Sequence, residues 1–320
     1  MSQASPRVLA LCGGVGGAKL VLGLSHIVAG EDLMVVVNTG DDFDHLGLRV
    51  CPDIDTVSYT LAGVVNPETG WGRAGETGEF MAALASLGGE DWFFLGDRDL
   101  ALHVERTRRL RDGETLSDIT ADFACKLGVT VNIVPMSDDP VATKVATKEG
   151  ELAFQHYFVR ERCQPAVTGF RFQGIDRASP HSRIVEALQN PALEAVVICP
   201  SNPFVSIDPI LALPGLREAL TRCTAPVVAI SPIVGGAAVK GPTAKMMAEL
   251  NVAVTPAAVV THYAGLLEGF VLDERDAACK RTIERLVPHV SIGDTLMVNL
   301  DRKIALAEQV LALAGRCVAA

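Results

Sequence analysis

The chain has 320 residues, of which 49% are hydrophobic and 21% charged, and a formal net charge of −10. This length and balance fit one large α/β domain, or a core with a sizeable insertion, and they argue against extended disorder. The acidic charge argues against a protein that binds a nucleic-acid duplex, which needs a broad basic face. It is compatible with a local pocket for a small phosphorylated ligand.

The eight cysteines form no CxxC pair and show no zinc-finger spacing. We therefore expect reduced thiols in a cytoplasmic protein. Residues 1–7 contain no apolar stretch of a signal peptide, and no apolar run reaches the length of a membrane span. The sequence thus predicts a cytoplasmic protein with neither a membrane nor a nucleic acid as its partner.

Apolar runs alternate with helical periodicity in the first part of the chain. Arg7–Cys12 predicts a strand that ends at a glycine loop, and a helical pattern follows. Leu33–Val37 is a continuous β-branched run, which is typical of a parallel sheet covered on both faces. The other elements expected before residue 135 are helices at 53–62, 75–87, 99–110 and 116–127, and strands at 92–95 and 129–134.

The middle of the chain interrupts this alternation. Segments 143–147 and 152–158 flank a charged, glycine-containing turn, which predicts a hairpin, and 164–175 extends this β-rich excursion. The alternation then resumes, with strands expected at 195–199, 226–230 and 295–298, and helices at 184–188, 216–221, 244–250, 257–267 and 303–313.

Together these elements predict one α/β domain over residues 1–320 with a doubly wound, mostly parallel sheet. Two insertions are expected, a helical one at 97–128 and a β-rich hairpin at 141–177.

Five residues with four glycines follow the first predicted strand directly. Lys19 stands where a dinucleotide fingerprint needs its third glycine, while Ala18 and Leu20 break a Walker P-loop. The loop can still bind a phosphate by the same mechanism, because its glycines let the backbone approach a ligand and the next helix directs its N-terminus at that ligand. We expect phosphate or nucleotide binding here, and the alternative is a tight turn without a ligand. The expected residues are Gly13, Gly14, Val15, Gly16, Gly17 and Lys19.

Two acidic clusters follow in the chain. Asp41 and Asp42 come directly after the second strand, and Asp53 and Asp55 open the next helix. Ligands of doubly wound sheets bind outside the carboxyl ends of the strands. If both clusters converge there, they form a site of hard oxygen ligands for Mg²⁺ that leaves room for phosphate and water. The alternative is that Asp53 and Asp55 only complement the helix N-terminus.

Further polar turns follow other apparent strands. Arg98, between two aspartates, offers a planar fork to a phosphate or carbonyl, or else belongs to a solvated ion-pair cluster. Ser201 and Asn202 both donate and accept hydrogen bonds, which suits a nucleobase or ribose. Gly235 and Gly236 lie in a loop that offers backbone N–H groups, and a nearby lysine, to a phosphate. Six such turns after six apparent strands indicate a shared site.

These motifs together resemble the 2-phospho-L-lactate transferase family. The match runs in order from residue 8 to residue 265, and its most specific elements are Cys51–Thr56 and Leu95–Asp99. Gly70-Trp71-Gly72 also belongs to it. Relatives carry Thr where this chain has Val15, a change that a loop acting through its backbone tolerates.

The resemblance implies a Rossmann-like fold and a homodimer. It implies transfer of a phospho-acid from a GMP diphosphate diester to the ribityl hydroxyl of the deazaflavin Fo in coenzyme F-420 biosynthesis, with Mg²⁺ as cofactor and GMP released. The acid is lactate, enolpyruvate or glycerate. By resemblance, Fo is contacted by Arg98 and by Asp53 or Asp55.

Such a transfer depends mainly on positioning and charge neutralisation. Mg²⁺ held among Asp41, Asp42, Asp53 and Asp55 would stabilise the leaving GMP, and a further aspartate would accept the ribityl proton. The division of roles among these four stays open, with Asp42 and Asp55 as the proposed catalytic residues.

Three alternatives compete with this interpretation. A regulator of gluconeogenesis that binds UDP-sugars has a similar first loop and a related fold, but it does not need the second acidic pair. A Rossmann dehydrogenase is disfavoured by the missing third glycine. A purely structural oligomer leaves the six polar turns unexplained.

Overall fold

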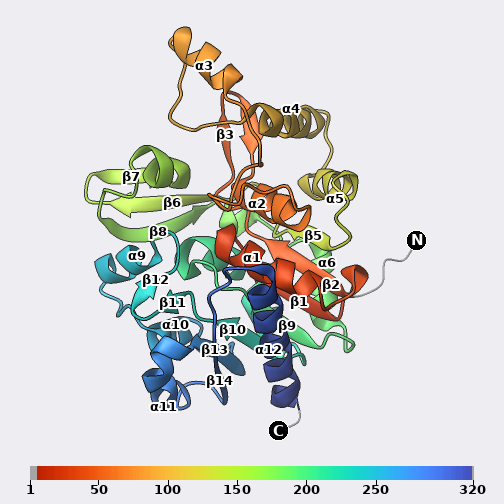
Figure 1. The fold of residues 1–320 in the computed structure, drawn as a ribbon, viewed down its shortest axis with the longest axis vertical. Helices are drawn as coiled ribbons and strands as arrows, with labels where there is room; N and C mark the ends of the chain where they lie inside the picture. Colours follow the sequence, from red (N-terminus) through yellow and green to blue (C-terminus); the bar gives the residue numbers. More distant parts are fainter. Residues whose placement is uncertain (1–5, 319–320) are drawn as a thin grey trace.

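Seven parallel strands form the central sheet of the computed structural model, which describes residues 6–318 (Figure 1). The strand order is β14-β13-β10-β9-β1-β2-β5, and every neighbouring pair is parallel. The predicted doubly wound α/β fold is therefore confirmed. The strands are β1 (Val8–Cys12), β2 (Leu33–Val37), β5 (Asn132–Pro135), β9 (Ala195–Ile198), β10 (Val227–Ile230), β13 (Gly269–Asp273) and β14 (His289–Gly293).

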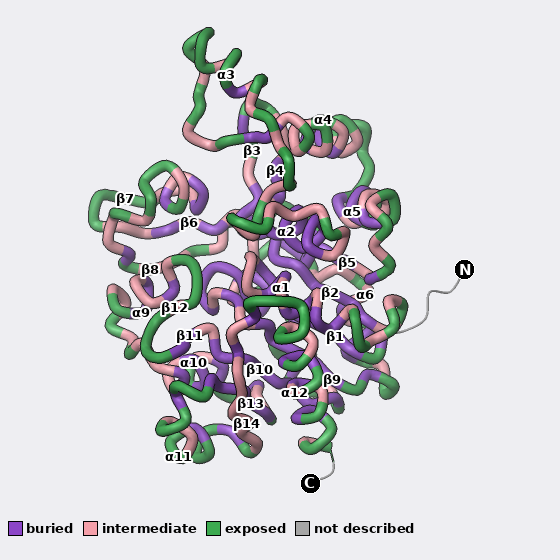
Figure 2. Tube along the Cα trace, viewed as in Figure 1, coloured by how far each residue is buried: buried purple, intermediate pink, exposed green. Residues whose placement is uncertain are grey.

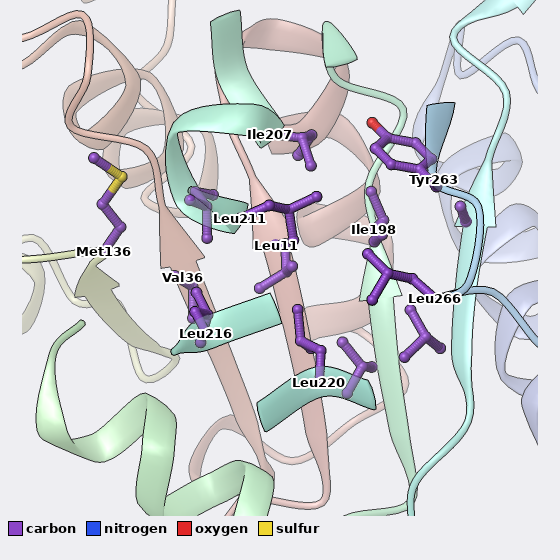
Figure 3. Packing of buried hydrophobic residues seen from close by; sticks show 14 of the residues in the cluster. Leu11, Val36, Met136, Ile198, Ile207, Leu211, Leu216, Leu220, Tyr263 and Leu266 are labelled. Atoms are coloured by element: carbon purple, nitrogen blue, oxygen red, sulfur yellow. The ribbon is translucent and has the colours of Figure 1, made fainter. Parts of the chain in front are cut away.

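The continuous apolar strands form because both faces of the sheet are covered. Successive side chains of β1 point to opposite faces, so Leu11 joins one hydrophobic cluster and Ala10 joins the other. Figure 3 shows Leu11 and Ile198, which belong to neighbouring strands, packed among the leucines of the helices that cover the face to which Leu11 points. Figure 2 shows the strands buried in the middle of the molecule.

Helices cover both faces of the sheet. On one face pack α1 (Gly14–Ser25), α2 (Pro52–Leu61), α5 (Leu116–Lys126) and α12 (Leu300–Val318). The apolar stripe of α12 repeats at helical spacing, which explains why this long helix forms there. On the other face lie α6 (Ser182–Gln189), α7 (Asp208–Leu211), α8 (Leu216–Arg222), α9 (Thr243–Glu249), α10 (Pro256–His262) and α11 (Lys280–Ile283).

Three excursions leave the sheet. The first, which we call the arm, consists of residues 43–50 and 76–111 and projects from the molecule in Figure 1. It contains β3 (Phe43–His45), β4 (Leu48–Val50), α3 (Glu79–Ser86) and α4 (Asp97–Arg111) around a small hydrophobic cluster of its own. The other two are the antiparallel sheet of β6 (Ala142–Thr147), β7 (Gly150–Ala153) and β8 (Val167–Gln173), and the hairpin of β11 (Ile233–Val234) and β12 (Ala237–Ala238).

Several expected elements differ from the structure. Residues 92–95 form no strand, because Trp92 and Phe93 pack against Phe43 inside the arm instead of joining a sheet. Residues 295–298 are also irregular, and the last strand is β14, several residues earlier. β13 was not predicted. After β7 the chain turns helical over 156–160, so the expected strand at 152–158 is wrong in its second half.

The helices of the described residues include none that is both long enough and apolar enough to cross a membrane.

Candidate functional site

The strand order reverses between β1 and β9. From β1 the chain continues to β2 and β5 on one side, and then returns to β9 on the other side of β1. Such a reversal opens a crevice at the carboxyl ends of the two strands, where ligands of doubly wound sheets bind. Ser201, which follows β9, connects the ends of the two strands. Its hydroxyl donates to the Gly13 carbonyl (2.7 Å) and accepts from the Gly13 N–H (3.2 Å).

The glycine loop is the first turn of α1, which begins at Gly14. A Cβ added to Gly16 would lie 2.5 Å from the Pro200 carbonyl oxygen, and one on Gly17 would lie 2.6 Å from Ser201 Oγ. These two glycines therefore let α1 pack directly on the loop after β9. The first turn has no acidic side chain and no side-chain cap within its own helix, and its positive end points to the crevice, where the Asp53 carboxylate meets it at the Gly14 N–H.

Asp53 connects the acidic clusters to the glycine loop. It accepts a 2.6 Å hydrogen bond from the Gly14 N–H and a 3.0 Å bond from Asn38 Nδ2. The same Asn38 amide donates to Asp41 Oδ1 at 3.0 Å. Asp41 and Asp53, from the two predicted clusters, thus meet at one amide group.

Burial sets the charge state of this pair. It raises the pKa of Asp53 to about 6, although the bonds from Asn38 and Gly14 work in the opposite direction. The pKa of Asp41 is also raised, first by burial and then by the neighbouring charges of Asp53 and Asp42. Two buried carboxylates this close favour either a shared proton or a bound cation.

Asp42 lies in a different environment from Asp41. Its side chain is fully covered, and neither carboxylate oxygen has a hydrogen-bond partner among residues 6–318. The nearest cation is the Arg49 guanidinium, with 3.8 Å between Arg49 Nη2 and Asp42 Oδ2. Burial raises the pKa of Asp42 to about 7, against the opposing effect of Arg49. A buried carboxylate without partners is costly for the fold, which makes Asp42 a candidate functional group.

Asp55 is held by a buried ion pair. The guanidinium of Arg106, which is only 2% exposed, donates to both Asp55 oxygens. His103 lies beside this pair, 3.8 Å from Asp55, and 3.5 Å from Asp99, which in turn accepts from the Tyr59 hydroxyl. The charge of Asp55 is thus already compensated by α4.

Arg98 lies at the start of α4, at the base of the arm, and its side chain is exposed. Glu76 caps this helix end by accepting from the backbone N–H groups of Arg98 (2.7 Å) and Asp99 (3.0 Å). Within residues 6–318 the guanidinium of Arg98 forms no ion pair, unlike Arg108 and Arg109 further along the helix. It remains available to a ligand.

The remaining predicted residues have the following positions. Asn202 caps the turn after β9, with its Oδ1 accepting from the Phe204 N–H at 3.0 Å. Gly235 and Gly236 form the turn of the β11–β12 hairpin. Lys19 is half-buried in the second turn of α1, and its pKa is lowered by burial and by two other lysines.

The four aspartates do not gather as one ligand set. Residues 6–318 contain no cluster of three or more His, Cys, Asp or Glu side chains arranged to hold a metal ion. Instead Asp41 and Asp53 form a pair, Asp42 is isolated, and Asp55 is bound to Arg106.

Asn38 and Arg106 organise the site, although neither was among the predicted site residues. Asn38 could have been identified, because it directly follows the second strand. Arg106 gives no such signal, because it is one of several arginines in a helix whose sequence is rich in charged residues.

A groove of about 840 Å³ lies at the opposite, amino-terminal edge of the sheet, lined by Arg7, Asp32, Glu194 and Pro226 among others. Arg7 and Glu194 pair with each other there. The polar side chains that the sequence singled out lie instead at the carboxyl edge.

Comparison with known proteins identifies the family. The family described as 2-phospho-L-lactate transferase CofD matches residues 8–302. The chain belongs to this family. It is 42% identical over 314 residues to a phosphoenolpyruvate transferase of Streptomyces griseus, covering 96% of this chain and 98% of the relative. It is 40% identical over 299 residues to a 2-phospho-L-lactate transferase of Methanosarcina mazei, covering 93% and 97%.

The predicted resemblance is therefore confirmed, and with it an enzyme of the transferase class. A solved structure of a UPF0052 family protein from Bacillus halodurans has a similar fold, with a TM-score of 0.59 and 15% identity over 96% of this chain and 99% of the other. At that identity the likeness concerns the fold alone. The regulator and dehydrogenase alternatives are not favoured by these relatives.

Proposed function

We propose that this chain transfers a phospho-acid from a GMP diphosphate diester to the deazaflavin Fo in coenzyme F-420 biosynthesis. The observation that carries the proposal is the family match, which spans residues 8–302 and so includes the glycine loop, both acidic clusters and the loop after β9. The relatives are named for two different acids, 2-phospho-L-lactate and phosphoenolpyruvate. The proposed donor acid of this chain is one of these two, or glycerate, the third acid that the resemblance implies.

In this reaction the ribityl hydroxyl oxygen of Fo attacks the phosphorus that carries the acid. A new P–O bond forms, the diphosphate bridge breaks, and GMP leaves with the bridging oxygen. The hydroxyl proton passes to a carboxylate, for which Asp42 is the proposed acceptor, since neither of its oxygens accepts a hydrogen bond among residues 6–318 and its nearest cation, Arg49, lies 3.8 Å away. Asp55 supports this acceptor indirectly, because it fixes Arg106 beside it.

The crevice residues would hold the donor. The N-terminus of α1 directs backbone N–H groups toward the diphosphate, and Lys19 adds a further phosphate contact. In the β11–β12 turn the Gly235 N–H already donates to the Asp276 carboxylate (2.8 Å), so the phosphate contact proposed for this turn falls to Gly236. Ser201 keeps the α1 turn against the β9 loop, where Asn202 would contact the guanosine. Arg98 and Asp53 would contact Fo.

Mg²⁺ fits the pair formed by Asp41 and Asp53. Both are buried carboxylates with raised pKa, converging on Asn38, and Mg²⁺ is commonly bound by one or two carboxylates together with substrate phosphates. When bound, the ion would neutralise the charge that develops on the leaving GMP. We further propose that the protein acts in the cytoplasm as a homodimer, as the family resemblance implies.

The test is transfer itself. Purified protein is incubated with Fo, Mg²⁺ and each of the three donor diesters, and product mass and GMP release are followed. Formation of F-420-0 from one donor, or of its dehydro form, supports the proposal and identifies the acid. Binding of a UDP-sugar, with no turnover of any diester, would point to the regulator instead.

A further inference from the structure

The loop 64–74, which follows α2, is a closed unit. At its base Val65 and Arg73 pair as an isolated antiparallel bridge. Beside this bridge the Ala74 N–H donates to the Val64 carbonyl at 2.8 Å. Because both ends of the loop are tied to each other, the backbone of Arg73 has a defined position relative to α2.

The loop also connects the two halves of the candidate site. At its tip, a Cβ added to Gly70 would lie 2.8 Å from a Val15 methyl group, so the tip covers the first turn of α1. Just after the loop, a Cβ added to Gly75 would lie 3.4 Å from Arg98 Nη1. Arg73 is three residues from the first glycine and two from the second, and three residues span at most about 11 Å. Arg73 therefore lies between the proposed diphosphate site and the proposed contact to Fo.

The guanidinium of Arg73 has no anionic partner. Within residues 6–318 it forms no ion pair, unlike Arg106 and Arg109, and its Nε is buried without a hydrogen-bond acceptor. The group lies over the ring of the buried Tyr59, with 5.7 Å between Arg73 Cζ and the ring centroid. The Tyr59 hydroxyl is in turn fixed by Asp99. A buried donor without an acceptor is unfavourable, and the side chain as a whole is only half-buried, so this group is available to a ligand.

A carboxylate is the group that the three candidate acids have in common besides the phosphate. In the proposed transfer the phosphorus that carries the acid lies between the diphosphate bridge and the ribityl oxygen, so the carboxylate lies beside both. A carboxylate that leaves water needs a cation or several donors. Lys19 and Arg98 are the cations proposed for the diphosphate and for Fo, which leaves the carboxylate of the acid without one.

We propose that Arg73 binds the carboxylate of the transferred acid and so selects phosphate esters that carry one. The identity of the acid rests on the proposed function. A planar guanidinium matches a carboxylate with two parallel hydrogen bonds, and stacking on an aromatic ring leaves its donor edge free. Because lactate, enolpyruvate and glycerate all carry this group, Arg73 does not choose among them. It discriminates against donors in which the carboxylate is missing.

The experiment compares two esters of GDP that differ only in the carboxylate. One is the lactyl diester, and the other is the isopropyl ester, in which a methyl group replaces the carboxylate. Isothermal titration of the full-length protein measures both affinities for the wild type, Arg73→Met and Arg73→Lys. The matched control is Arg108→Met, which removes an exposed arginine paired with Glu105.

We expect the wild type to bind the lactyl diester about tenfold more tightly than the isopropyl ester, as one charge-assisted contact provides. Arg73→Met should bind both esters equally, with the isopropyl affinity of the wild type. Arg73→Lys should recover part of the preference, because it keeps the charge but not the planar fork. Arg108→Met should keep the full preference.

Three results would overturn the assignment. The first is an unchanged preference in Arg73→Met, and the second is a wild type that binds neither ester or both equally. The third is an equal loss for both esters in Arg73→Met together with a lower melting temperature, which would show that Arg73 only holds the loop on Tyr59.

These outcomes are distinguishable from failure of the proposed function. A carboxylate preference that depends on Arg73, in a protein that transfers nothing to Fo, keeps the carboxylate site and refutes the transferase. Transfer to Fo with the wild-type preference in Arg73→Met keeps the transferase and refutes the carboxylate site. Circular dichroism spectra confirm that each variant is folded.

Discussion

Arg106 is a buried charge that several acids share. Its guanidinium binds both oxygens of Asp55, and it also acts on Asp42. Burying a charged group is costly unless it is paired, and removing one partner leaves the other charge uncompensated. This residue therefore matters for both the fold and the acidic site.

Replacing Arg106 with Met should lower the free energy of unfolding by about 3–5 kcal/mol, the cost of breaking a buried ion pair. Urea denaturation measures the loss. The double variant Arg106→Met/Asp55→Leu removes both charges and should recover most of it. If the single and double variants are equally unstable, the pair is not what stabilises this region. Turnover of the refolded double variant then shows whether Asp55 itself is needed for transfer.

Arg98 is exposed at the base of the arm and forms no ion pair within residues 6–318. Arg98→Ala should weaken Fo binding about tenfold, as expected for the loss of a planar charged contact, and leave the melting temperature unchanged. Isothermal titration with Fo measures the affinity. Arg108→Ala, on the same helix but paired with Glu105, is the control. Unchanged Fo affinity in Arg98→Ala would remove this residue from the proposed deazaflavin site.

Asp42 predicts a pH dependence of stability. Its pKa is raised by burial from its usual value of 3.8 to about 7. An acid with a raised pKa favours the folded state below its unfolded pKa, and this contribution is lost as the pH rises through the folded pKa. The free energy of unfolding should therefore fall between pH 5 and pH 8, before any metal is added.

The variant Asp42→Asn stays neutral throughout this range. Its loss of stability between pH 5 and pH 8 should be smaller than that of the wild type by on the order of 2 kcal/mol. Asp44→Asn, an exposed neighbour, is the control and should keep the wild-type slope. Identical slopes in all three proteins would mean that Asp42 is ionised in the folded chain at every pH tested.

At the scale of elements, the contact between α1 and the loop after β9 shapes the crevice. Gly16→Ala would place a methyl group 2.5 Å from the Pro200 carbonyl oxygen, so the helix start must move away from the loop. The protein should stay folded, because overpacking of this size typically lowers the free energy of unfolding by only about 1–3 kcal/mol. The displaced start of α1 should lower the affinity for GMP about tenfold. Gly169→Ala is the control, because within residues 6–318 no atom beyond its two chain neighbours lies within 4 Å of the added carbon.

The elements that the sequence predicts well are central strands of the sheet, because their burial on both faces produces a continuous apolar run. β1, β2, β9 and β10 are apolar runs buried on both faces, and turns with glycine or proline mark their ends. The segment 92–95 has the same apolar pattern, but it packs in the arm, where Leu95 is buried and Phe94 is 51% exposed, and periodicity alone does not distinguish such a segment from a sheet strand. β14 is only partly buried because it is an edge strand, so its pattern is weak.

The candidate site was predictable in its position but not in its pairings. Parallel strands place the glycine loop, the acids and Ser201 at one edge, and this follows from the strand pattern alone. Which aspartate binds Arg106 and which meets Asn38 depends on how α4 packs over α2. That packing joins residues that are far apart in the chain, so the spacing of residues within one element does not predict it.

At the scale of the whole molecule, the structure consists of one large sheet with two cores and a separate small core in the arm. The sheet clusters bury strands and helices together, whereas the arm cluster centres on three buried residues, Val50, Met81 and Leu95. Small cores stabilise less, and segments with few buried apolar contacts open at lower free energy than the global unfolding.

The arm should therefore unfold separately from the sheet. In native-state hydrogen exchange, amides of α3 should exchange at a lower opening free energy than those of β1. Met81→Ala should lower protection only within the arm, and Leu11→Ala should lower global stability by about 2–5 kcal/mol, as loss of a buried leucine does. If Met81→Ala lowers the protection of β1 as well, the arm and the sheet unfold as one unit. In that case α4, which carries both Arg98 and Arg106, is as firmly held as the central strands, and the proposed deazaflavin site cannot open independently of the sheet.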